Sequence, residues 1–167
     1  YWRGESKKEG RPVYGRLINT SSEAGLLGPE GQANYGAAKA GITALTLSAS
    51  RALKRYGVRA NAICPRARTA MTAAVFGEAP VDGIDPLSPD HVVRLIEFLA
   101  SPDSDDVTGQ VFVVYGPRVT LMAAPTVDEV FTADGDAWDS DDLTKTLTSY
   151  FAERDPSKTF TARGLVN

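Results

Sequence analysis

The sequence contains only one cysteine and one histidine among its 167 residues. Because Cys64 has no second cysteine to pair with, an internal disulfide is excluded, and a reducing cytoplasm is the natural location for such a chain. A structural zinc site takes about four Cys or His ligands, which Cys64 and His91 cannot supply. We therefore expect a cytoplasmic protein without a metal centre.

Long hydrophobic runs and an excess of positive charge are also missing. No apolar stretch approaches the roughly 20 residues that span a bilayer, and the opening YWRGESKKEGR is too polar for a secretory signal. The net charge of −3 argues against general affinity for nucleic acid or anionic membrane. The composition, 43% hydrophobic and 23% charged, is ordinary for a soluble globular protein, so we expect neither nucleic acid nor a membrane as a partner.

Apolar segments with two different periods alternate along much of the chain. Helical spacing of apolar residues predicts helices over 34–56 and 88–101. Short apolar runs predict strands over 16–22, 58–64 and 109–116, and the last is continuously apolar, as in strands covered on both faces. Strand, helix, strand, helix, strand is the pattern of an α/β domain with a parallel sheet.

The C-terminal part of the chain differs from this pattern. Within it, DSDDLTKTLTSYFAER (139–154) predicts one amphipathic helix between irregular segments. We therefore divide the chain into a domain over 1–116 and a C-terminal extension over 117–167. Because three strands make a thin sheet for this class, we expect the domain to be part of a larger fold.

The segment NYGAAKAG (34–41) places Tyr35 and Lys39 four positions apart. On a helix such residues share one face, with their β-carbons about 5–6 Å apart. A free tyrosine has a pKa of about 10, so proton exchange near neutral pH requires that its phenolate be stabilised. The ammonium group of Lys39 could supply that stabilisation in a site shielded from water.

Ser22 follows the first predicted strand, at the sheet edge where ligands bind in open α/β folds. Its hydroxyl could hydrogen-bond a substrate oxygen and hold it near the phenol of Tyr35. Taken alone, a tyrosine and a lysine at this spacing are more often a half-buried ring beside a solvated cation. The spacing by itself leaves both interpretations open.

The order of the motifs favours the interpretation of Tyr35 and Lys39 as a proton-transfer pair. Two serines follow a strand, a loop with glycines comes next, and GQANYGAAKAG opens a helix that leads to VRANAICP. In this order and spacing, residues 15–116 resemble the short-chain dehydrogenase/reductase family. The resemblance implies a Rossmann-type, doubly wound parallel sheet and an oxidoreductase that uses NAD or NADP. It implies that Ser22 orients the substrate oxygen, Tyr35 is the general acid/base, and Lys39 assists Tyr35 and holds the nicotinamide ribose.

The family's cofactor fingerprint, Thr-Gly followed by spaced glycines, does not occur in this sequence. In such folds the glycines hold the pyrophosphate at a helix N-terminus. We therefore expect the sequence to be the C-terminal half of a longer enzyme, without the N-terminal nucleotide-binding half. The half alone is expected to be inactive, whereas the intact protein would be an active enzyme.

The segment CPRARTAMT (64–72) lacks the Pro-Gly that many members have after this strand. It resembles the branch with 3-oxoacyl reductases and the hydroxyacyl-CoA dehydrogenase unit of multifunctional enzyme type 2, in fatty-acid β-oxidation. The resemblance implies that the backbone of Pro65, Arg66 and Ala67 and the hydroxyl of Thr69 contact the nicotinamide carboxamide. Arg66 and Arg68 either contact a phosphate or a thioester-bearing substrate, or are solvated loop charges.

The function implied is interconversion of a secondary alcohol and a ketone, with a 3-hydroxyacyl or 3-oxoacyl thioester as the substrate class of the branch. The helix over 34–56 also has a flat face of small residues, namely Gly36, Ala37, Ala40, Gly41, Ala44 and Ser48. In the resembled family this helix lies in a dimer interface, which implies a homodimer or homotetramer. The alternative to this catalytic function is a non-catalytic half-domain that acts as a binding or assembly module.

Overall fold

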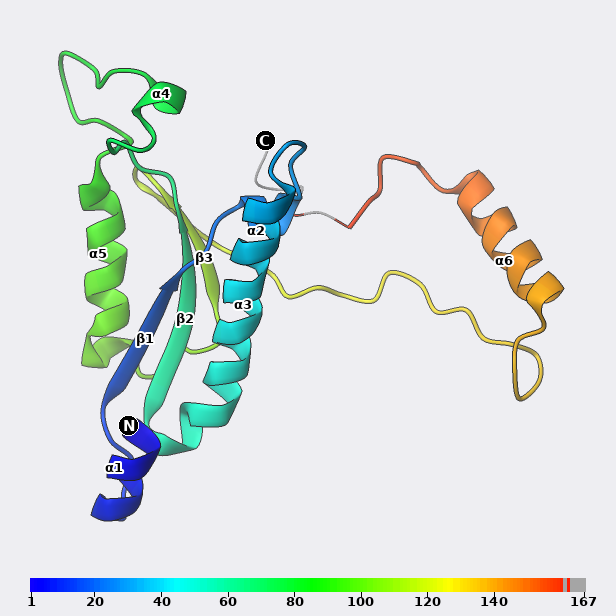
Figure 1. The fold of residues 1–167 in the computed structure, drawn as a ribbon, viewed down its shortest axis with the longest axis horizontal. Coiled ribbons are helices and arrows are strands. Elements are labelled where there is room, and N and C mark those ends of the chain that lie inside the picture. Colours follow the sequence, from blue (N-terminus) through cyan, green and yellow to red (C-terminus); the bar gives the residue numbers. More distant parts are fainter. Residues whose placement is uncertain (161, 163–167) are drawn as a thin grey trace. The chain divides into compact units, whose positions relative to one another are not determined.

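The computed structural model describes residues 1–160 and 162, and the chain divides into two compact units, Tyr1–Met122 and Ala123–Asn167. The first unit is a layered α/β domain, whose course can be followed in Figure 1. Its elements are, in order, α1 (Trp2–Glu9), β1 (Gly15–Thr20), α2 (Ala24–Leu27), α3 (Ala33–Leu53), the 3-10 turn η1 (Lys54–Tyr56), β2 (Val58–Pro65), α4 (Ala73–Phe76), α5 (Pro89–Ala100), the 3-10 turn η2 (Pro102–Ser104), β3 (Val111–Tyr115) and β4 (Arg118–Leu121).

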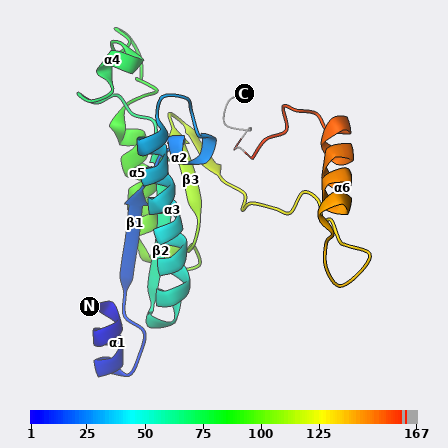
Figure 2. The same cartoon turned by 45° about the vertical axis from the view of Figure 1, so that its right-hand side comes forward.

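The sheet has the strand order β1-β2-β3-β4, with β1, β2 and β3 parallel. Thr20 pairs with Ile63, and Pro65 pairs with Val114, so the carboxyl ends of the three parallel strands meet at one edge. The helix α3 covers one face of the sheet and α5 covers the other (Figures 1 and 2). Helices on both faces of a mostly parallel sheet confirm the expected Rossmann-type fold class.

The strand β4 is an addition to the elements that the sequence indicated. Gly116, with a φ of 53°, forms the turn after β3, and Arg118 then pairs antiparallel with Tyr115. Only Gly adopts this left-handed conformation without a steric cost. With four residues of which three are exposed, β4 has no hydrophobic period that the sequence could reveal. The first unit therefore extends to Met122.

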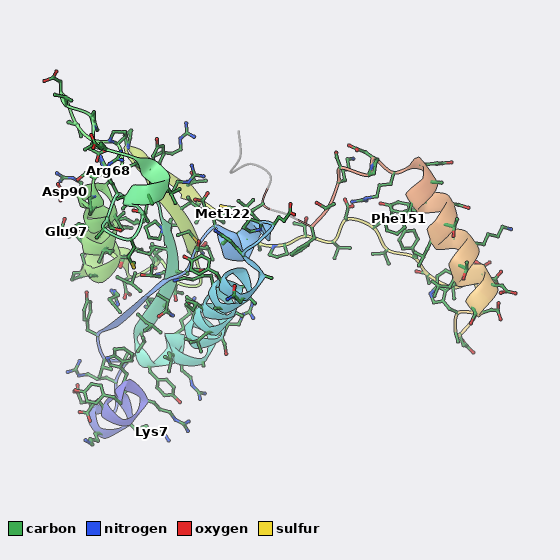
Figure 3. The ribbon with its side chains drawn as sticks, turned by 45° about the horizontal axis from the view of Figure 1, so that its top comes forward. Lys7, Arg68, Asp90, Glu97, Met122 and Phe151 are labelled. Atoms are coloured by element: carbon green, nitrogen blue, oxygen red, sulfur yellow. The ribbon has the colours of Figure 1, made fainter. Side chains whose placement is uncertain are left out.

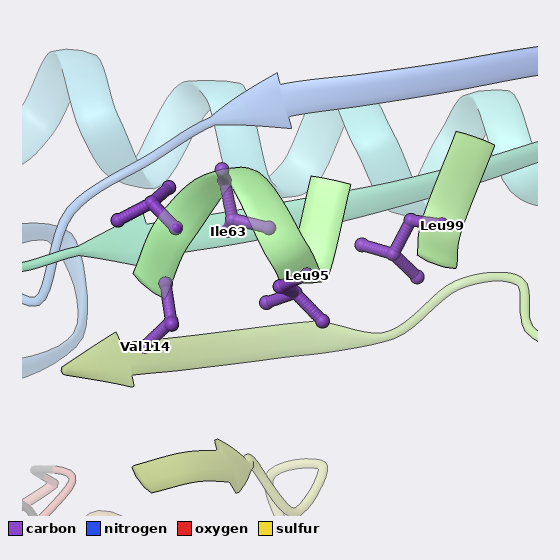
Figure 4. Packing of buried hydrophobic residues seen from close by; sticks show 5 residues of the cluster. Ile63, Leu95, Leu99 and Val114 are labelled. Atoms are coloured by element: carbon purple, nitrogen blue, oxygen red, sulfur yellow. The ribbon is translucent and has the colours of Figure 1, made fainter. Parts of the chain in front are cut away.

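The core of the first unit lies between α5 and the sheet. Val92, Leu95 and Leu99 of α5 pack against Ile63 of β2 and Val114 of β3 (Figure 4). These three helix positions belong to the apolar face that the three- and four-residue spacing predicts. Ser88 caps the helix by accepting a hydrogen bond of 3.3 Å from the Asp90 amide, and the exposed side chains of Asp90 and Glu97 lie on the outer face (Figure 3).

The helix α3 packs on the sheet through small and hydroxyl-bearing residues. Gly36, Thr46 and Ser50 are buried, whereas the apolar residue Leu45 is 63% exposed. Thr46 is tolerated in the interior because its hydroxyl accepts a hydrogen bond of 2.8 Å from the Asn19 amide nitrogen and donates one to the Ile42 carbonyl. Neither α3 nor any other helix among the described residues has the length and apolarity that a bilayer crossing needs.

The second unit contains α6 (Ser140–Glu153), where the sequence predicts a helix. Asp139 caps its first turn by accepting a hydrogen bond of 2.8 Å from the Asp141 amide. Tyr150 packs edge-to-face against Phe131, with ring centres 4.9 Å apart. None of the described residues from 123 onward is buried, and Phe151 remains 62% exposed.

Candidate active site

Tyr35 and Lys39 lie together near the N-terminal end of α3, as their spacing predicts. The Nζ of Lys39 lies 5.6 Å from the centre of the Tyr35 ring, within the range of an attractive cation–π contact. Tyr35 is 46% exposed, so the residue lies partly at the surface of the domain. The two residues therefore form one unit at the surface of the helix.

A hydrogen bond fixes Lys39 to the sheet. Its Nζ donates to the carbonyl oxygen of Thr20, the last residue of β1, at 3.0 Å. The ammonium group therefore lies at the carboxyl end of β1, two residues before Ser22. This edge of an open α/β sheet is where ligands bind.

Ser22 lies in the turn between β1 and α2. Its Oγ accepts a hydrogen bond of 3.2 Å from the Ala24 amide, and its carbonyl oxygen accepts one of 3.0 Å from the Gly25 amide. The structure thus brings Tyr35 and Lys39 together and places Ser22 on the turn next to the Lys39 anchor. Among the contacts of the described residues, the Ser22 hydroxyl is bonded to this turn and not to Tyr35.

The turn that carries Ser22 is packed tightly against α3. Ser21 is 2% exposed, and its Oγ donates a hydrogen bond of 2.8 Å to the Lys39 carbonyl oxygen. A Cβ on Gly25 would lie only 2.6 Å from the Ala40 nitrogen, so only glycine permits this approach of α2 to α3. Cys64 of β2 is fully buried beside Ser21, and burial raises the pKa of its thiol to about 11.

Arg66 follows β2 and makes contacts that neither sequence interpretation anticipates. Its Nε and Nη2 donate hydrogen bonds of 2.5 Å to the two carboxylate oxygens of Glu23, the residue after Ser22. The guanidinium group also lies 5.6 Å from the centre of the Tyr115 ring. The hydrogen bonds to Glu23 raise the pKa of Arg66. Arg66 is therefore an ion-pair partner within the domain and not a solvated loop charge.

The remaining residues after β2 form a hydrogen-bonded turn. The Ala67 carbonyl oxygen accepts a hydrogen bond of 2.7 Å from the Thr72 hydroxyl. Thr69 is exposed, its amide donates to the same hydroxyl at 2.8 Å, and the two threonine hydroxyls lie 3.2 Å apart. This turn places Thr69 at the surface of the domain, just after the segment Pro65–Ala67.

Arg68 closes the loop that follows (Figure 3). Its Nε lies 3.0 Å from a carboxylate oxygen of Asp85, and its Nη1 donates to the carbonyl oxygens of Phe76 and Gly77. The hydrogen bond from Arg68 and a second from the Leu87 amide lower the pKa of Asp85. Arg68 is therefore a structural residue of this loop.

Comparison with known proteins extends this description. A family model described as enoyl-(acyl carrier protein) reductase matches residues 5–116, which contain every candidate site residue. The chain belongs to the short-chain dehydrogenase/reductase family. The crystal structure of a short-chain dehydrogenase from Mycobacterium avium is similar with a TM-score of 0.75 and 37% identity, over 97% of this chain and 52% of that one.

Curated members of the short-chain dehydrogenase/reductase family have similar sequences. Hydroxyacyl-CoA dehydrogenase ChsB1 of Mycobacterium tuberculosis is 65% identical over 170 residues, which cover 99% of this chain and 54% of the relative. The human (3R)-3-hydroxyacyl-CoA dehydrogenase is 41% identical over 103 residues, covering 57% of this chain and 39% of the relative. The chain therefore spans about half the length, or less, of these curated relatives.

The pairing of Glu23 with Arg66 is the feature of this candidate site that sequence reasoning missed. Glu23 follows Ser22, and Arg66 follows the next parallel strand, so both side chains start from the same sheet edge. The two partners are 43 residues apart. Their positions after two predicted parallel strands are the signal by which the sequence could have indicated this contact.

Proposed function

We propose that the whole protein interconverts a secondary alcohol and a ketone, with NAD or NADP as cofactor. The observation that carries this proposal is the Tyr35–Lys39 pair, with Lys39 fixed 3.0 Å from the Thr20 carbonyl oxygen at the carboxyl end of β1. The family supports an oxidoreductase. The names of the two curated relatives support a 3-hydroxyacyl or 3-oxoacyl thioester as substrate.

Each site residue has a defined part in this proposal. Tyr35 takes the hydroxyl proton from the alcohol, or returns it to the ketone oxygen. The Ser22 hydroxyl donates a hydrogen bond to the same substrate oxygen, and the positive charge of Lys39 favours the phenolate form of Tyr35. The bound nicotinamide supplies or accepts the hydride.

Two groups of residues fit the nicotinamide end of the cofactor. The exposed Thr69 hydroxyl and the backbone of Pro65, Arg66 and Ala67 are proposed to hold the carboxamide. The Arg66 amide donates a 3.0 Å hydrogen bond to the Val114 carbonyl oxygen, which keeps this segment at the sheet edge. Lys39, on the neighbouring helix, is proposed to bind the ribose. Polar groups from two elements therefore line the place where the cofactor would lie.

We further propose that the protein is a cytoplasmic homodimer or homotetramer. The exposed positions of α3 include the small residues Ala37, Ala40, Gly41 and Ala44, beside the 63% exposed Leu45. A flat, apolar helix face of this kind permits close approach of a second copy. Sedimentation of the whole protein tests this state, and a monomer would contradict it.

The activity is tested by following reduced nicotinamide while the whole protein is mixed with a 3-hydroxyacyl-CoA thioester and NAD or NADP. Replacing Tyr35 by Phe should lower kcat by between about 10²- and 10⁴-fold, the usual effect of losing a general acid or base. Tyr56→Phe is the matched control, because Tyr56 lies in η1, beyond the far end of α3. A kcat that is unchanged by Tyr35→Phe would overturn the proposal. A wild-type protein without turnover would overturn it as well and would favour a non-catalytic module.

A further inference from the structure

Ser22 lies between two residues that are each fixed to a different element. Ser21 is held to α3 through the Lys39 carbonyl oxygen and through the Thr43 hydroxyl, both 2.8 Å from its Oγ. Glu23 is held to the end of β2 through Arg66. The position of the Ser22 hydroxyl therefore depends on both anchors.

The Glu23–Arg66 contact has the geometry of a strong ion pair. Two nitrogens of the planar guanidinium group face the two carboxylate oxygens, each at 2.5 Å. The Glu23 side chain is 15% exposed and that of Arg66 is 36% exposed. Partial burial and two parallel hydrogen bonds hold the carboxylate in one orientation, which a single surface contact would not do.

This ion pair connects the ends of three strands. Glu23 follows β1, Arg66 follows β2, and the Arg66 guanidinium lies 5.6 Å from the ring of Tyr115, the last residue of β3. Glu23 directly precedes α2, and its carbonyl oxygen accepts hydrogen bonds from the Leu26 and Leu27 amides of that helix. A shift of Glu23 would therefore move the turn that holds Ser22.

We propose that Glu23 and Arg66 are positioning residues that hold the Ser22 hydroxyl in its catalytic place. The proposal rests on the function proposed above. Neither side chain needs to touch the substrate. Glu23 fixes the turn after β1, and Arg66 fixes Glu23 to the end of β2. The geometry of the substrate oxygen is thereby set by the sheet, and not by the turn alone.

The test measures kcat of the whole protein in two backgrounds, wild type and Ser22→Ala, with the 3-hydroxyacyl-CoA assay. In the wild-type background, Glu23→Ala and Arg66→Ala should each lower kcat by about tenfold, within the hundredfold that a 1 Å misplacement can cost. The kcat of the double variant should be no lower than that of the slower single variant, because both changes break the same ion pair. In the Ser22→Ala background, either change should lower kcat by less than about twofold, since the hydroxyl that it positions is gone.

A matched control lies at the other end of β2. Arg59, near the opposite end of β2, also binds a carboxylate from a loop, that of Asp105, at 2.9 Å. Arg59→Ala should lower the melting temperature without lowering kcat of the folded protein. Glu23→Gln and Arg66→Lys retain the size of the side chain and part of its hydrogen bonding. They replace the alanine variants in this test if the alanine variants do not fold. Both should lower kcat by less than the alanine variants do.

The outcomes separate this proposal from the proposed function. Equal losses from Glu23→Ala in the wild-type and Ser22→Ala backgrounds would overturn the positioning role, because the effect would not pass through Ser22. Unchanged kcat in Glu23→Ala and Arg66→Ala, while Ser22→Ala lowers kcat, would overturn it as well. A protein in which Ser22→Ala and Tyr35→Phe both keep full turnover would instead overturn the proposed function.

Discussion

The ammonium nitrogen of Lys39 lies 5.6 Å from the centre of the Tyr35 ring while it donates a 3.0 Å hydrogen bond to the end of β1. The cation is therefore placed by the sheet as well as by its own helix. A lysine held only by its flexible stem would sample many positions relative to the phenol. The anchor on β1 gives the pair a fixed geometry before any ligand binds.

The close approach of α2 to α3 at Gly25 predicts that Gly25→Ala will damage both folding and activity. The added Cβ would lie 2.6 Å from the Ala40 nitrogen and 2.8 Å from the Lys39 carbonyl carbon. Because both are helix backbone atoms, α2 must move away, at a cost of about 1–3 kcal/mol in the free energy of unfolding. Urea unfolding and kcat measure the two effects.

The control for this substitution is Gly4→Ala in α1. A Cβ at Gly4 meets no atom within 4 Å, and the residue is exposed within a helix. Alanine there should stabilise the protein by about 0.5–1 kcal/mol. Destabilisation of equal size at both glycines would contradict the packing explanation.

Burial of Cys64 predicts a pH-dependent loss of stability. Its pKa rises from 9.0 to about 11 on folding, chiefly because the buried thiolate would lose its hydration. Below about pH 9 the thiol is protonated in both states, so its contribution to stability is fully present. As the pH rises from about 9 to about 11, the unfolded chain releases this proton while the folded protein retains it, which favours unfolding until the contribution is lost.

The measurement is urea unfolding of wild type and Cys64→Ala between about pH 8 and about pH 11. A shift of two pKa units corresponds to about 3 kcal/mol, so the wild type should lose up to this amount relative to the variant. Alkylation of Cys64 by iodoacetamide should also require unfolding. A thiol that reacts rapidly in the native protein would show that the site is open.

The Arg68–Asp85 pair predicts a carboxyl group whose pKa lies below its ordinary value. The hydrogen bond from Arg68 lowers the pKa of Asp85, so its contribution to stability is present at neutral pH and lost as the pH falls through the folded pKa. In an NMR titration, Arg68→Ala should raise the pKa of Asp85 towards the ordinary value of about 3.9. Arg94→Ala on the exposed side of α5 is the control, and an unmoved Asp85 titration in Arg68→Ala would refute the assignment.

Local patterns in the sequence predict those features that depend on neighbouring residues. The four-residue spacing of Tyr35 and Lys39 predicts their shared face, because an α-helix fixes that geometry whatever it packs against. The signals Ser88 and Pro89 likewise predict the start of α5. The parallel sheet follows from the alternation of strands and helices.

Features that depend on distant residues are not visible in the sequence. In the sequence, Arg66 cannot be distinguished from a solvated loop charge, because only folding places Glu23 opposite its guanidinium group. Thr46 is buried instead of Leu45 because Asn19 on β1 supplies a partner for its hydroxyl. In both cases the decisive contact joins segments that lie far apart in the chain.

The central claim is that Tyr35 and Lys39 form one proton-transfer unit, and kcat of Tyr35→Phe, Lys39→Met and the double variant tests it most directly. If Lys39 acts through the phenol of Tyr35, the double variant should be no slower than the slower single variant, within about twofold. Losses that multiply, so that the double variant is slower by the product of the two single effects, would show that the residues act independently and would contradict this account.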